Sequence, residues 1–449
     1  MISPRTPLLF LTALILVPAL AVFVAVPSLA AVSALVLLAF VLLVSIDAAF
    51  LQPDFASIRI LVPEVVRLSK GRDGKIDIKL VNDGAREIRL RIGFPFPTEI
   101  AAVQNEFDVD LAAGASAKEA LAQSNTRALS ISCLPQQRGR FLLEKFYAQA
   151  ATRLRLWNVR RALSIQSELR VYPDLLSERR NITALFLRRG MFGFRQHRQV
   201  GKGREFEKLR EYITGDGIED VHWKATAKRG HPVTKVFQIE RTQEVYVVVD
   251  FSRLSRRWSG GMPMLERFVN CALILCLAAA KQSDLFGLIT FSDKVQKFVR
   301  AKNGKAHYDV CRDALYTLQP QIVTPDFGDL FTFLRSRLRR RALLIFLTAL
   351  DDPALAASFI QHVELLTRQH FVLVNMIQSP EAQPLFVDPN VTDLDEIYRR
   401  LGGHLVWGEL QEIGKRLQRF GAEFSLVDAD KFAVEAVNRY IRIKQRQLL

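Results

Sequence analysis

The chain has 449 residues. Because a hydrophobic core stops growing at roughly 250–300 residues, this length excludes a single compact domain. The formal net charge of +16 favours an anionic partner, either phospholipid or nucleic acid. The four cysteines form no CxxC pair and have no histidine at zinc-ligand spacing, which argues against a zinc site and gives no reason to expect a disulfide.

Two apolar segments, 7–26 and 29–46, are each about as long as the 20 residues needed to cross a bilayer. Only Pro27 and Ser28 separate them, so residues 1–50 are predicted to form a transmembrane helical hairpin. Basic residues follow with few compensating acids, which places the rest of the chain in the cytoplasm. A cleaved signal peptide is the alternative, because Ser28 to Ala30 resembles a cleavage site. The long first run and the apolar sequence that resumes at once favour the hairpin.

Residues 54–172 are predicted to form a β-sandwich of immunoglobulin type. Segments 76–81 and 88–92 alternate apolar and polar residues, as half-buried strands do, and Asn82-Asp83-Gly84 between them is a turn signal. Further strands are expected at about 128–134, 139–146 and 163–171. We see no catalytic cluster in this segment, so we expect a spacing or docking module.

Residues 173–240 are interpreted as a basic connector followed by a collar. The connector carries several arginines among aromatics that form no nucleic-acid motif, which favours a solvated or membrane-facing linker. The collar, residues 201–229, is dense in both signs of charge. Its apolar side chains are expected to pack against the next strand; they are Phe206, Leu209, Tyr212 and Trp223.

Residues 241–449 alternate strand and helix patterns, which predicts a doubly wound parallel sheet covered on both faces. Ligands of such sheets bind beyond the carboxyl ends of the strands. The residues to inspect are therefore 250–255 and 348–352. The expected strands are 245–249, 285–291, 295–299, 342–347, 371–377 and 423–427. The expected helices are 263–281, 308–318, 326–337, 353–369, a helix across 392–400 and 410–420, and a C-terminal helix.

Many residues of the collar, and the two that lead into the strand ending at Asp250, match one known pattern. They are Gly203, Glu205, Phe206, Leu209, Arg210, Glu211, Tyr212, Gly215, Asp216, Trp223, Lys224, Ala227, Lys228, Glu240 and Arg241. The pattern resembles the bacterial family of domain of unknown function 58. Its members join a two-span membrane hairpin and a β-sandwich to a von Willebrand factor A domain, and the domain order agrees over essentially the whole chain.

The resemblance implies a multi-pass protein of the bacterial cytoplasmic membrane whose soluble domains face the cytoplasm. It also implies a protein partner, a MoxR-type AAA+ ATPase, and a part in the assembly or maturation of other complexes, with no established catalytic activity. We therefore expect a non-enzymatic adaptor that binds protein partners through a von Willebrand factor A-like domain. No nucleic acid is expected.

A von Willebrand factor A domain commonly carries a metal-ion-dependent adhesion site. An Asp-x-Ser-x-Ser loop, a Thr and a second Asp hold a divalent cation such as Mg²⁺, and a partner's carboxylate completes the shell. The candidate metal ligands that the resemblance indicates here are Asp250, Ser252, Thr324 and Asp351.

The sequence departs from that site at two positions. Leu254 stands at the third loop position, with Ser255 one residue late, and Ala349 stands where the second Asp is expected, with Asp351 two residues on. Two oxygen donors are thus lost, which predicts a degenerate site that binds Mg²⁺ weakly or works without it.

The collar departs as well, since the family usually has a basic residue where Glu219 stands and an acid where His222 stands. One interpretation is that Glu219 and His222 form a local ion pair in which the two charges have exchanged positions relative to the family.

Two other functions compete with the adaptor. A metal-assisted hydrolase would be centred on Asp250 and on Asp351-Asp352, but no nucleophile and base at a recognisable spacing accompany them. Binding of nucleic acid through the basic surface would leave the membrane hairpin unexplained.

Overall fold

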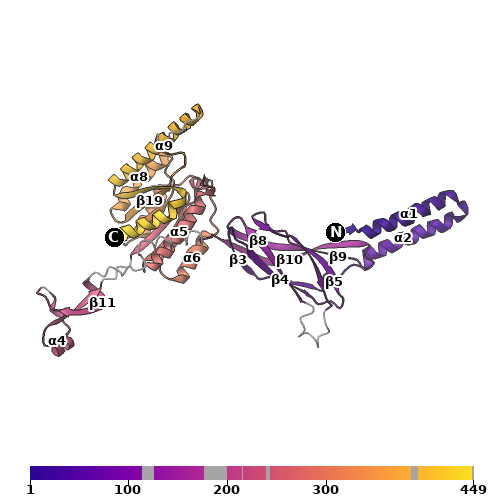
Figure 1. Cartoon of the computed structure of the whole chain (residues 1–449), viewed down its shortest axis with the longest axis horizontal. Helices are drawn as coiled ribbons and strands as arrows, with labels where there is room; N and C mark the ends of the chain where they lie inside the picture. Colours follow the sequence, from indigo (N-terminus) through magenta and orange to yellow (C-terminus); the bar gives the residue numbers. More distant parts are fainter. Residues whose placement is uncertain (114–125, 176–199, 215, 239–242, 386–392, 447–449) are drawn as a thin grey trace. The chain divides into compact units, whose positions relative to one another are not determined.

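The computed structural model describes residues 1–113, 126–175, 200–214, 216–238, 243–385 and 393–446, apart from the side chains at 27, 200–208 and 236–238. The basic connector at 176–199 lies outside these residues, as do Gly215, Glu240 and Arg241 of the family pattern. The chain divides into two compact units, Met1–Asp174 and Leu175–Leu449 (Figure 1).

The first unit begins with a helical hairpin. A short strand β1 (Ile2–Pro4) precedes helices α1 (Thr6–Ala25) and α2 (Ala30–Phe50), which a 3₁₀ turn at Pro27–Leu29 joins. Both helices are long and apolar enough to cross a membrane, and only 6% and 11% of their most apolar windows are buried. The core helix of a soluble protein would bury far more of its apolar surface, because that burial drives its folding.

Two sheets follow the hairpin and enclose one core. The smaller has the order β2-β4-β8-β6, and the larger has the order β1-β10-β9-β5-β7, with β3 also paired to β10. Strand β4 shows how the alternation works, since Ile76, Ile78 and Leu80 are fully buried and the residues between them are exposed. The strands are β2 (Ile58–Leu61), β3 (Val65–Ser69), β4 (Gly74–Asn82), β5 (Ile88–Gly93), β6 (Ile100–Ala102), β7 (Glu106–Leu111), β8 (Thr126–Pro135), β9 (Gly139–Ala151) and β10 (Trp157–Tyr172).

The turn predicted after β4 is present, but it does not pair the strands that it joins. Strand β4 belongs to the smaller sheet and β5 to the larger, so the chain crosses between the sheets here. Buried Asn82 holds the crossing, because its amide nitrogen donates to the carbonyls of Arg86 and Ala112 and its side-chain oxygen accepts from the N–H of Gly84. A local turn signal cannot tell a hairpin from a crossing, since Asn and Gly suit both.

The second unit contains the collar and an α/β fold. The collar is a two-stranded antiparallel sheet, β11 (Val200–Glu211) with β12 (Val233–Gln238), connected through a 3₁₀ turn at Ile218–Asp220 and helix α4 (Trp223–Arg229).

The α/β fold is a six-stranded sheet in the order β17-β16-β13-β18-β19-β20. Numbered along the chain, this order is 3-2-1-4-5-6, that of a doubly wound fold. All neighbours pair in parallel except β17, which runs antiparallel at one edge. The strands are β13 (Glu244–Asp250), β16 (Leu285–Phe291), β17 (Val295–Lys302), β18 (Leu343–Leu347), β19 (Phe371–Ile377) and β20 (Ala422–Val427). A small hairpin, β14 (Trp258–Ser259) with β15 (Met262–Pro263), precedes the first helix.

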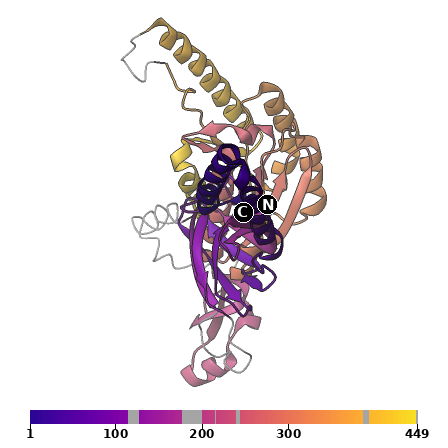
Figure 2. The ribbon, with the colours of Figure 1, turned by 90° about the vertical axis from the view of Figure 1, so that its right-hand side faces the viewer.

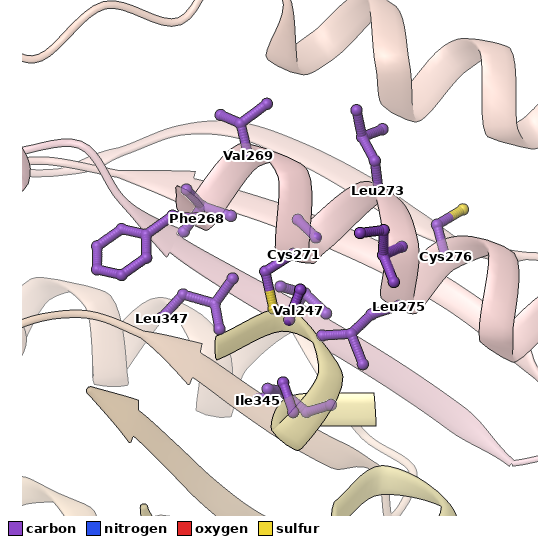
Figure 3. Packing of buried hydrophobic residues seen from close by; sticks show 14 of the residues in the cluster. Val247, Phe268, Val269, Cys271, Leu273, Leu275, Cys276, Ile345 and Leu347 are labelled. Carbon is purple, nitrogen blue, oxygen red and sulfur yellow. The ribbon is translucent and has the colours of Figure 1, made fainter. Parts of the chain in front are cut away.

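Helices cover both faces of this sheet, as predicted. On one face, α5 packs Phe268, Cys271 and Leu275 over Val247 and Ile345 in a core that α6 and α10 complete (Figure 3). Helices α7, α8 and α9 build the core on the other face. The helices are α5 (Met264–Lys281), α6 (Lys305–Leu315), α7 (Phe327–Arg337), α8 (Pro353–Thr367), α9 (Leu394–Arg419) and α10 (Phe432–Gln445).

Helix α9 is present as expected: the segments 392–400 and 410–420 belong to one continuous helix of 26 residues, Leu394–Arg419. Its C-terminal half buries Leu410, Ile413 and Leu417 against the sheet. In Figure 2 the N-terminal half projects from the α/β fold. The glycines between the two predicted segments do not break the helix, and buried Gly403 is needed for packing, since a Cβ there would lie 1.9 Å from the carbonyl oxygen of Glu381.

Candidate functional site

The predicted site lies at the carboxyl edge of the six-stranded sheet. Strand β13 ends at Asp250 and its neighbour β18 ends at Leu347, directly before Thr348. These two strands are the first and fourth along the chain, so the order of the sheet reverses between them. Open α/β sheets bind ligands at such a point.

Asp250 is fully buried at this edge. Its Oδ2 accepts a hydrogen bond of 2.6 Å from the Thr348 hydroxyl, and its Oδ1 accepts one of 2.9 Å from the Ser252 N–H. Burial raises the pKa of Asp250 above its ordinary value, and the bonds from Thr348 and Ser252 oppose that rise. Both carboxylate oxygens are therefore already engaged by the protein.

The loop after Asp250 folds back on itself. Ser252 caps the 3₁₀ turn Arg253–Arg256, because its hydroxyl accepts from the Leu254 N–H at 3.4 Å. The Ser255 hydroxyl donates to the Ser252 carbonyl at 2.9 Å. Leu254, at the third loop position, is buried in the core beneath the loop. Ser255 thus supports the turn. Leu254, which stands where the adhesion-site pattern has a serine, packs in the core.

The second departure is also explained by packing. Ala349 and Leu350 are buried under the edge, and Asp351 beyond them is paired. The Arg257 guanidinium donates to both carboxylate oxygens of Asp351, with Nη2 and Oδ1 2.6 Å apart. This bond raises the pKa of Arg257 still further, so the guanidinium is fixed as a cation beside Asp351.

Arg253 binds Thr324 and Asp352 at this edge, as Arg257 binds Asp351. Its Nε donates to the Thr324 hydroxyl at 3.4 Å and its Nη2 donates to Asp352 at 3.2 Å. Asp352 also caps α8, where its Oδ1 accepts from the N–H groups of Ala354 and Leu355. The N–H of Leu355 contributes most to lowering the pKa of Asp352, so this carboxyl is ionised in its role as a cap.

Taken together, the candidate ligands do not fit a metal ion. Asp250 is satisfied by Thr348 and Ser252, while Thr324 and Asp351 contact guanidinium groups. Within the described residues, no three or more His, Cys, Asp or Glu side chains group in a way that could hold a metal ion. Fixed positive charge stands where a divalent cation would have to bind, which disfavours a second cation electrostatically.

Arg253 lies in the segment 250–255 that the sequence singled out, but neither Arg253 nor Arg257 was among the predicted metal ligands. The only signal was the basic run Arg253-Leu254-Ser255-Arg256-Arg257 directly after Asp250. Their carboxylate partners lie 99 and 94 positions further along the chain, so spacing alone could not have paired them. Arg253, Arg256 and Arg257 are exposed, as is Trp258, which leaves the edge basic with one accessible aromatic ring.

The collar residues form a tight local structure. Arg210 pairs with Asp216 at 2.6 Å, and the second Asp216 oxygen accepts from the Ile213 N–H at 3.1 Å. The Tyr212 hydroxyl donates to the Asp216 carbonyl. The N–H of Ile213 contributes most to lowering the pKa of Asp216, followed by Arg210. Three residues of the family pattern therefore build one turn.

The comparison with family models finds one match, which includes most of the collar. The model described as protein of unknown function DUF58 matches residues 208–394. Residues 208–394 are therefore similar to the DUF58 family. The resemblance read from the sequence is thus confirmed, and the match covers the collar from Lys208 onward and the α/β fold as far as the first residue of α9.

No curated protein matches the chain in sequence. Many solved structures resemble part of it, including the following three. A conserved hypothetical protein BatB from Bacteroides thetaiotaomicron is 18% identical with a TM-score of 0.30, over 45% of this chain and 99% of its own. An aerotolerance-related membrane protein from Bacteroides fragilis is 17% identical with a TM-score of 0.27, over 44% and 98%. The VWA domain of SpRpn10 is 9% identical with a TM-score of 0.27, over 44% and 95%. At such low scores these likenesses support no argument about function.

Within the DUF58 region, the collar differs from expectation in two respects. Tyr212 and Trp223 expose 37% and 67% of their surface, so these two do not pack against the next strand as expected. Leu209 is half-buried, and the side chains of Glu205 and Phe206 lie outside the described residues. The Nδ1 atom of His222 caps α4 by accepting from the Ala225 N–H at 3.0 Å. An acid would suit the same capping position, which explains why either residue type can stand at position 222.

Beyond the DUF58 region, helix α9 presents an apolar stripe. Its projecting N-terminal part, residues 394–406, is called the α9 arm here. Large apolar side chains recur on it at helical spacing and are exposed: Leu394 68%, Ile397 48%, Tyr398 70%, Leu401 44% and Leu405 61%. Gly403 and His404 of the arm lie against Glu381 and Leu385 in the loop that follows β19. The arm therefore extends from the carboxyl edge of the sheet, the same edge that carries Arg253 and Arg257.

Proposed function

We propose that this chain is a non-enzymatic adaptor of the bacterial cytoplasmic membrane that binds a protein partner at the carboxyl edge of its α/β sheet. The partner is a MoxR-type AAA+ ATPase, and the pair acts in the assembly or maturation of other complexes. In this proposal the α/β fold is a von Willebrand factor A-like domain and the two-sheet domain is an immunoglobulin-like spacer.

The α9 arm is the observation that carries this proposal. Five large apolar side chains exposed along one stripe of a helix are costly in water, and such stripes mark protein contacts that lay a helix into a groove. Arg253, Arg256 and Trp258 at the same edge add residue types that are enriched in binding hot spots. The positive charge of this edge suits a partner with an acidic surface.

The membrane anchor is supported by the hairpin. Helices α1 and α2 have 20 and 21 residues, a length of about 30 Å at 1.5 Å per residue, which matches the hydrocarbon thickness of a bilayer. Both ends of the hairpin contact the two-sheet domain, through β1 and through the loop between β9 and β10. With the basic residues that follow α2, this favours a cytoplasmic location for the remaining chain.

We propose that the chain is not an enzyme because the carboxylates that a hydrolase would use are already bound by other groups of the protein. A hydrolase centred on Asp250, Asp351 and Asp352 would need one of them as a base or a ligand. Asp250 is buried under Thr348, Asp351 is bound by Arg257, and Asp352 caps α8. These bonds favour the adaptor over the metal-assisted hydrolase.

The test is to purify the tagged full-length chain from its native membranes and identify what copurifies. We expect a MoxR-type ATPase with the unaltered chain, and a loss of about tenfold or more with the double variant Ile397→Asp and Leu401→Asp, because apolar hot spots carry most of an interface's energy. Leu365→Asp on α8 is the matched control, since Leu365 is 46% exposed but lies outside the arm. Absence of any AAA+ ATPase, or equal loss with the control, would refute the proposal.

A further inference from the structure

The loop between β9 and β10, residues 152–156, lies where both helices of the hairpin end. The N–H of Arg153 donates to the carbonyl of Leu51, just after α2, at 3.2 Å. The N–H of Arg5, just before α1, donates to the carbonyl of Leu156 at 3.0 Å. This loop, called the β9–β10 turn below, therefore contacts the chain on both sides of the hairpin (Figure 1).

The turn also reaches back along α2. Asp47 is fully buried, and its carboxylate accepts from the Thr152 hydroxyl at 2.6 Å and from the Leu154 N–H at 3.2 Å. Asp47 lies three residues before the last residue of α2, about 4.5 Å along the axis at 1.5 Å per residue. Trp157 reaches further, since its indole N–H donates to the carbonyl of Val44 at 3.1 Å. The turn is therefore level with the last turn of the helix.

The outer surface of the turn combines one apolar side chain with two cations. Leu154 is 47% exposed, and Arg153 and Arg155 on either side of it are exposed. Neither arginine pairs with an acid in the part of the chain that the structure describes. Arg155 has a positive φ of 57°, and its N–H donates to the carbonyl of Thr152 at 2.9 Å, which closes the turn.

We propose that the β9–β10 turn contacts the bilayer, with Leu154 at the border of the acyl chains and Arg153 and Arg155 on the phosphates of anionic phospholipids. This inference rests on the membrane anchor of the proposed function and is independent of the protein partner. A segment that is level with the end of a spanning helix lies at the boundary between headgroups and hydrocarbon. Exposed leucine beside arginine suits that boundary, because each side chain finds its preferred solvent within a few ångströms.

The contacts of Asp47 fit the same location. A carboxylate on the lipid-facing surface of a spanning helix is costly, and here Thr152 and Leu154 cover it. Trp157 is half-buried at the same level, where Trp is enriched in membrane proteins. Anionic lipid is the favoured occupant because the only exposed charges at 153–155 are positive.

The first experiment locates residue 154 in the full-length chain reconstituted in vesicles. All four native cysteines are buried, so Leu154→Cys offers a selective site for an environment-sensitive fluorophore. Ser69→Cys is the control: Ser69 is exposed and pairs with Tyr172, 15 residues along β10 from Trp157 and so about 50 Å away. We expect lipids with a nitroxide near the top of the acyl chain to quench the label at position 154 and not at 69.

The second experiment tests the charges. Arg153→Gln with Arg155→Asn removes both cations while placing a residue that tolerates positive φ at 155. Arg67→Gln with Lys75→Gln, at the opposite end of the two-sheet domain, makes the same change in net charge. Retention of phosphatidylglycerol over phosphatidylcholine by the detergent-purified chain is measured by native mass spectrometry. Because each cation near an anionic surface changes affinity about fivefold, we expect a loss of roughly thirty-fold for the first pair and little for the second.

The outcomes separate this inference from the proposed function. If the chain does not insert into vesicles and is extracted by alkaline carbonate, the anchor and this inference both fail. If it inserts but label 154 is quenched no more than label 69, or both double variants retain the anionic lipid equally, the anchor stands and the inference fails. Quenching of 154 only, with loss of phosphatidylglycerol in the first double variant only, supports it.

Discussion

Arg257 holds both carboxylate oxygens of Asp351, a residue 94 positions further along the chain. Arg253 spans a similar separation to reach Asp352 and also touches Thr324. The carboxyl edge of the sheet therefore carries its positive charge on its own side chains, at the place where the sequence predicted a degenerate metal site. A protein partner can then meet a fixed cationic surface that does not depend on the supply of divalent ions.

Mg²⁺ is expected to leave the stability of the full-length chain unchanged, because the oxygens that would bind it are already engaged. A site with a dissociation constant of about 0.5 mM would add about 1.4 kcal/mol at about 5 mM Mg²⁺. Thermal unfolding in detergent, with Mg²⁺ and with a chelator, measures this directly. An increase in Tm with Mg²⁺ that Asp250→Asn abolishes would contradict the metal-free account.

The pair between Arg257 and Asp351 should contribute modestly to stability. Their side chains are 48% and 25% exposed, so water screens the attraction and a coupling energy near the upper end of about 0.2–1 kcal/mol is expected. A double-mutant cycle with Arg257→Ala and Asp351→Ala, read by chemical denaturation, provides the value. Zero coupling would mean that the two groups do not meet in solution.

Asp250 should make stability depend on pH in a defined direction. Its pKa is raised in the folded state, so the stability it contributes is fully present below the unfolded pKa of about 3.9 and is lost as pH rises through the folded pKa. Asp250→Asn keeps an acceptor for the Ser252 N–H and removes the titration. The variant should therefore gain stability relative to the unaltered chain between pH 4 and pH 7, measured by Tm at each pH.

The alanine variant serves as the contrast. Asp250→Ala leaves the Thr348 hydroxyl and the Ser252 N–H unsatisfied in a buried place, which costs about 1–3 kcal/mol for each. If Asn and Ala were equally destabilising at pH 7, then the charge of Asp250, and not only its hydrogen bonds, would be needed for the fold.

Asp47 should couple the hairpin to the two-sheet domain. Replacing it by Ala leaves the Leu154 N–H without its acceptor and is expected to cost about 1–3 kcal/mol. Thr12→Ala in α1 is the matched control, because the Thr12 hydroxyl donates to the Leu9 carbonyl of its own helix. Tryptophan fluorescence during thermal unfolding follows both variants; a Tm for Asp47→Ala no lower than for Thr12→Ala would show that the contact carries no stability.

The sequence was most informative where patterns are local. Alternation predicted β4, and continuous apolar runs predicted β13, β16 and β19 almost to the residue, because burial on one or both faces leaves a direct record in the sequence. The turn at Asn82 was predicted, but the sequence did not show that it crosses between the two sheets, because that depends on distant parts of the chain. In the same way, nothing local showed that Gly403 accommodates the carbonyl of Glu381.

The candidate site shows the same limit more sharply. The resemblance correctly located Asp250 and Ser252 at the carboxyl edge of the sheet. The loss of two metal-binding oxygen atoms was also visible in the sequence. The roles of Thr348, Arg253 and Arg257 depend on contacts across 94 to 99 residues, which no local spacing encodes.

The most direct test of the central claim is photocrosslinking in native membranes. A photoreactive amino acid replaces Arg256, at the basic edge, or Leu401, on the α9 arm, in the full-length chain, and the products are identified by mass spectrometry with and without a chelator. The account predicts crosslinks to a MoxR-type ATPase from both positions at the same yield in both conditions. Loss of the crosslinks on chelation, or crosslinks that never include an AAA+ ATPase, would contradict it.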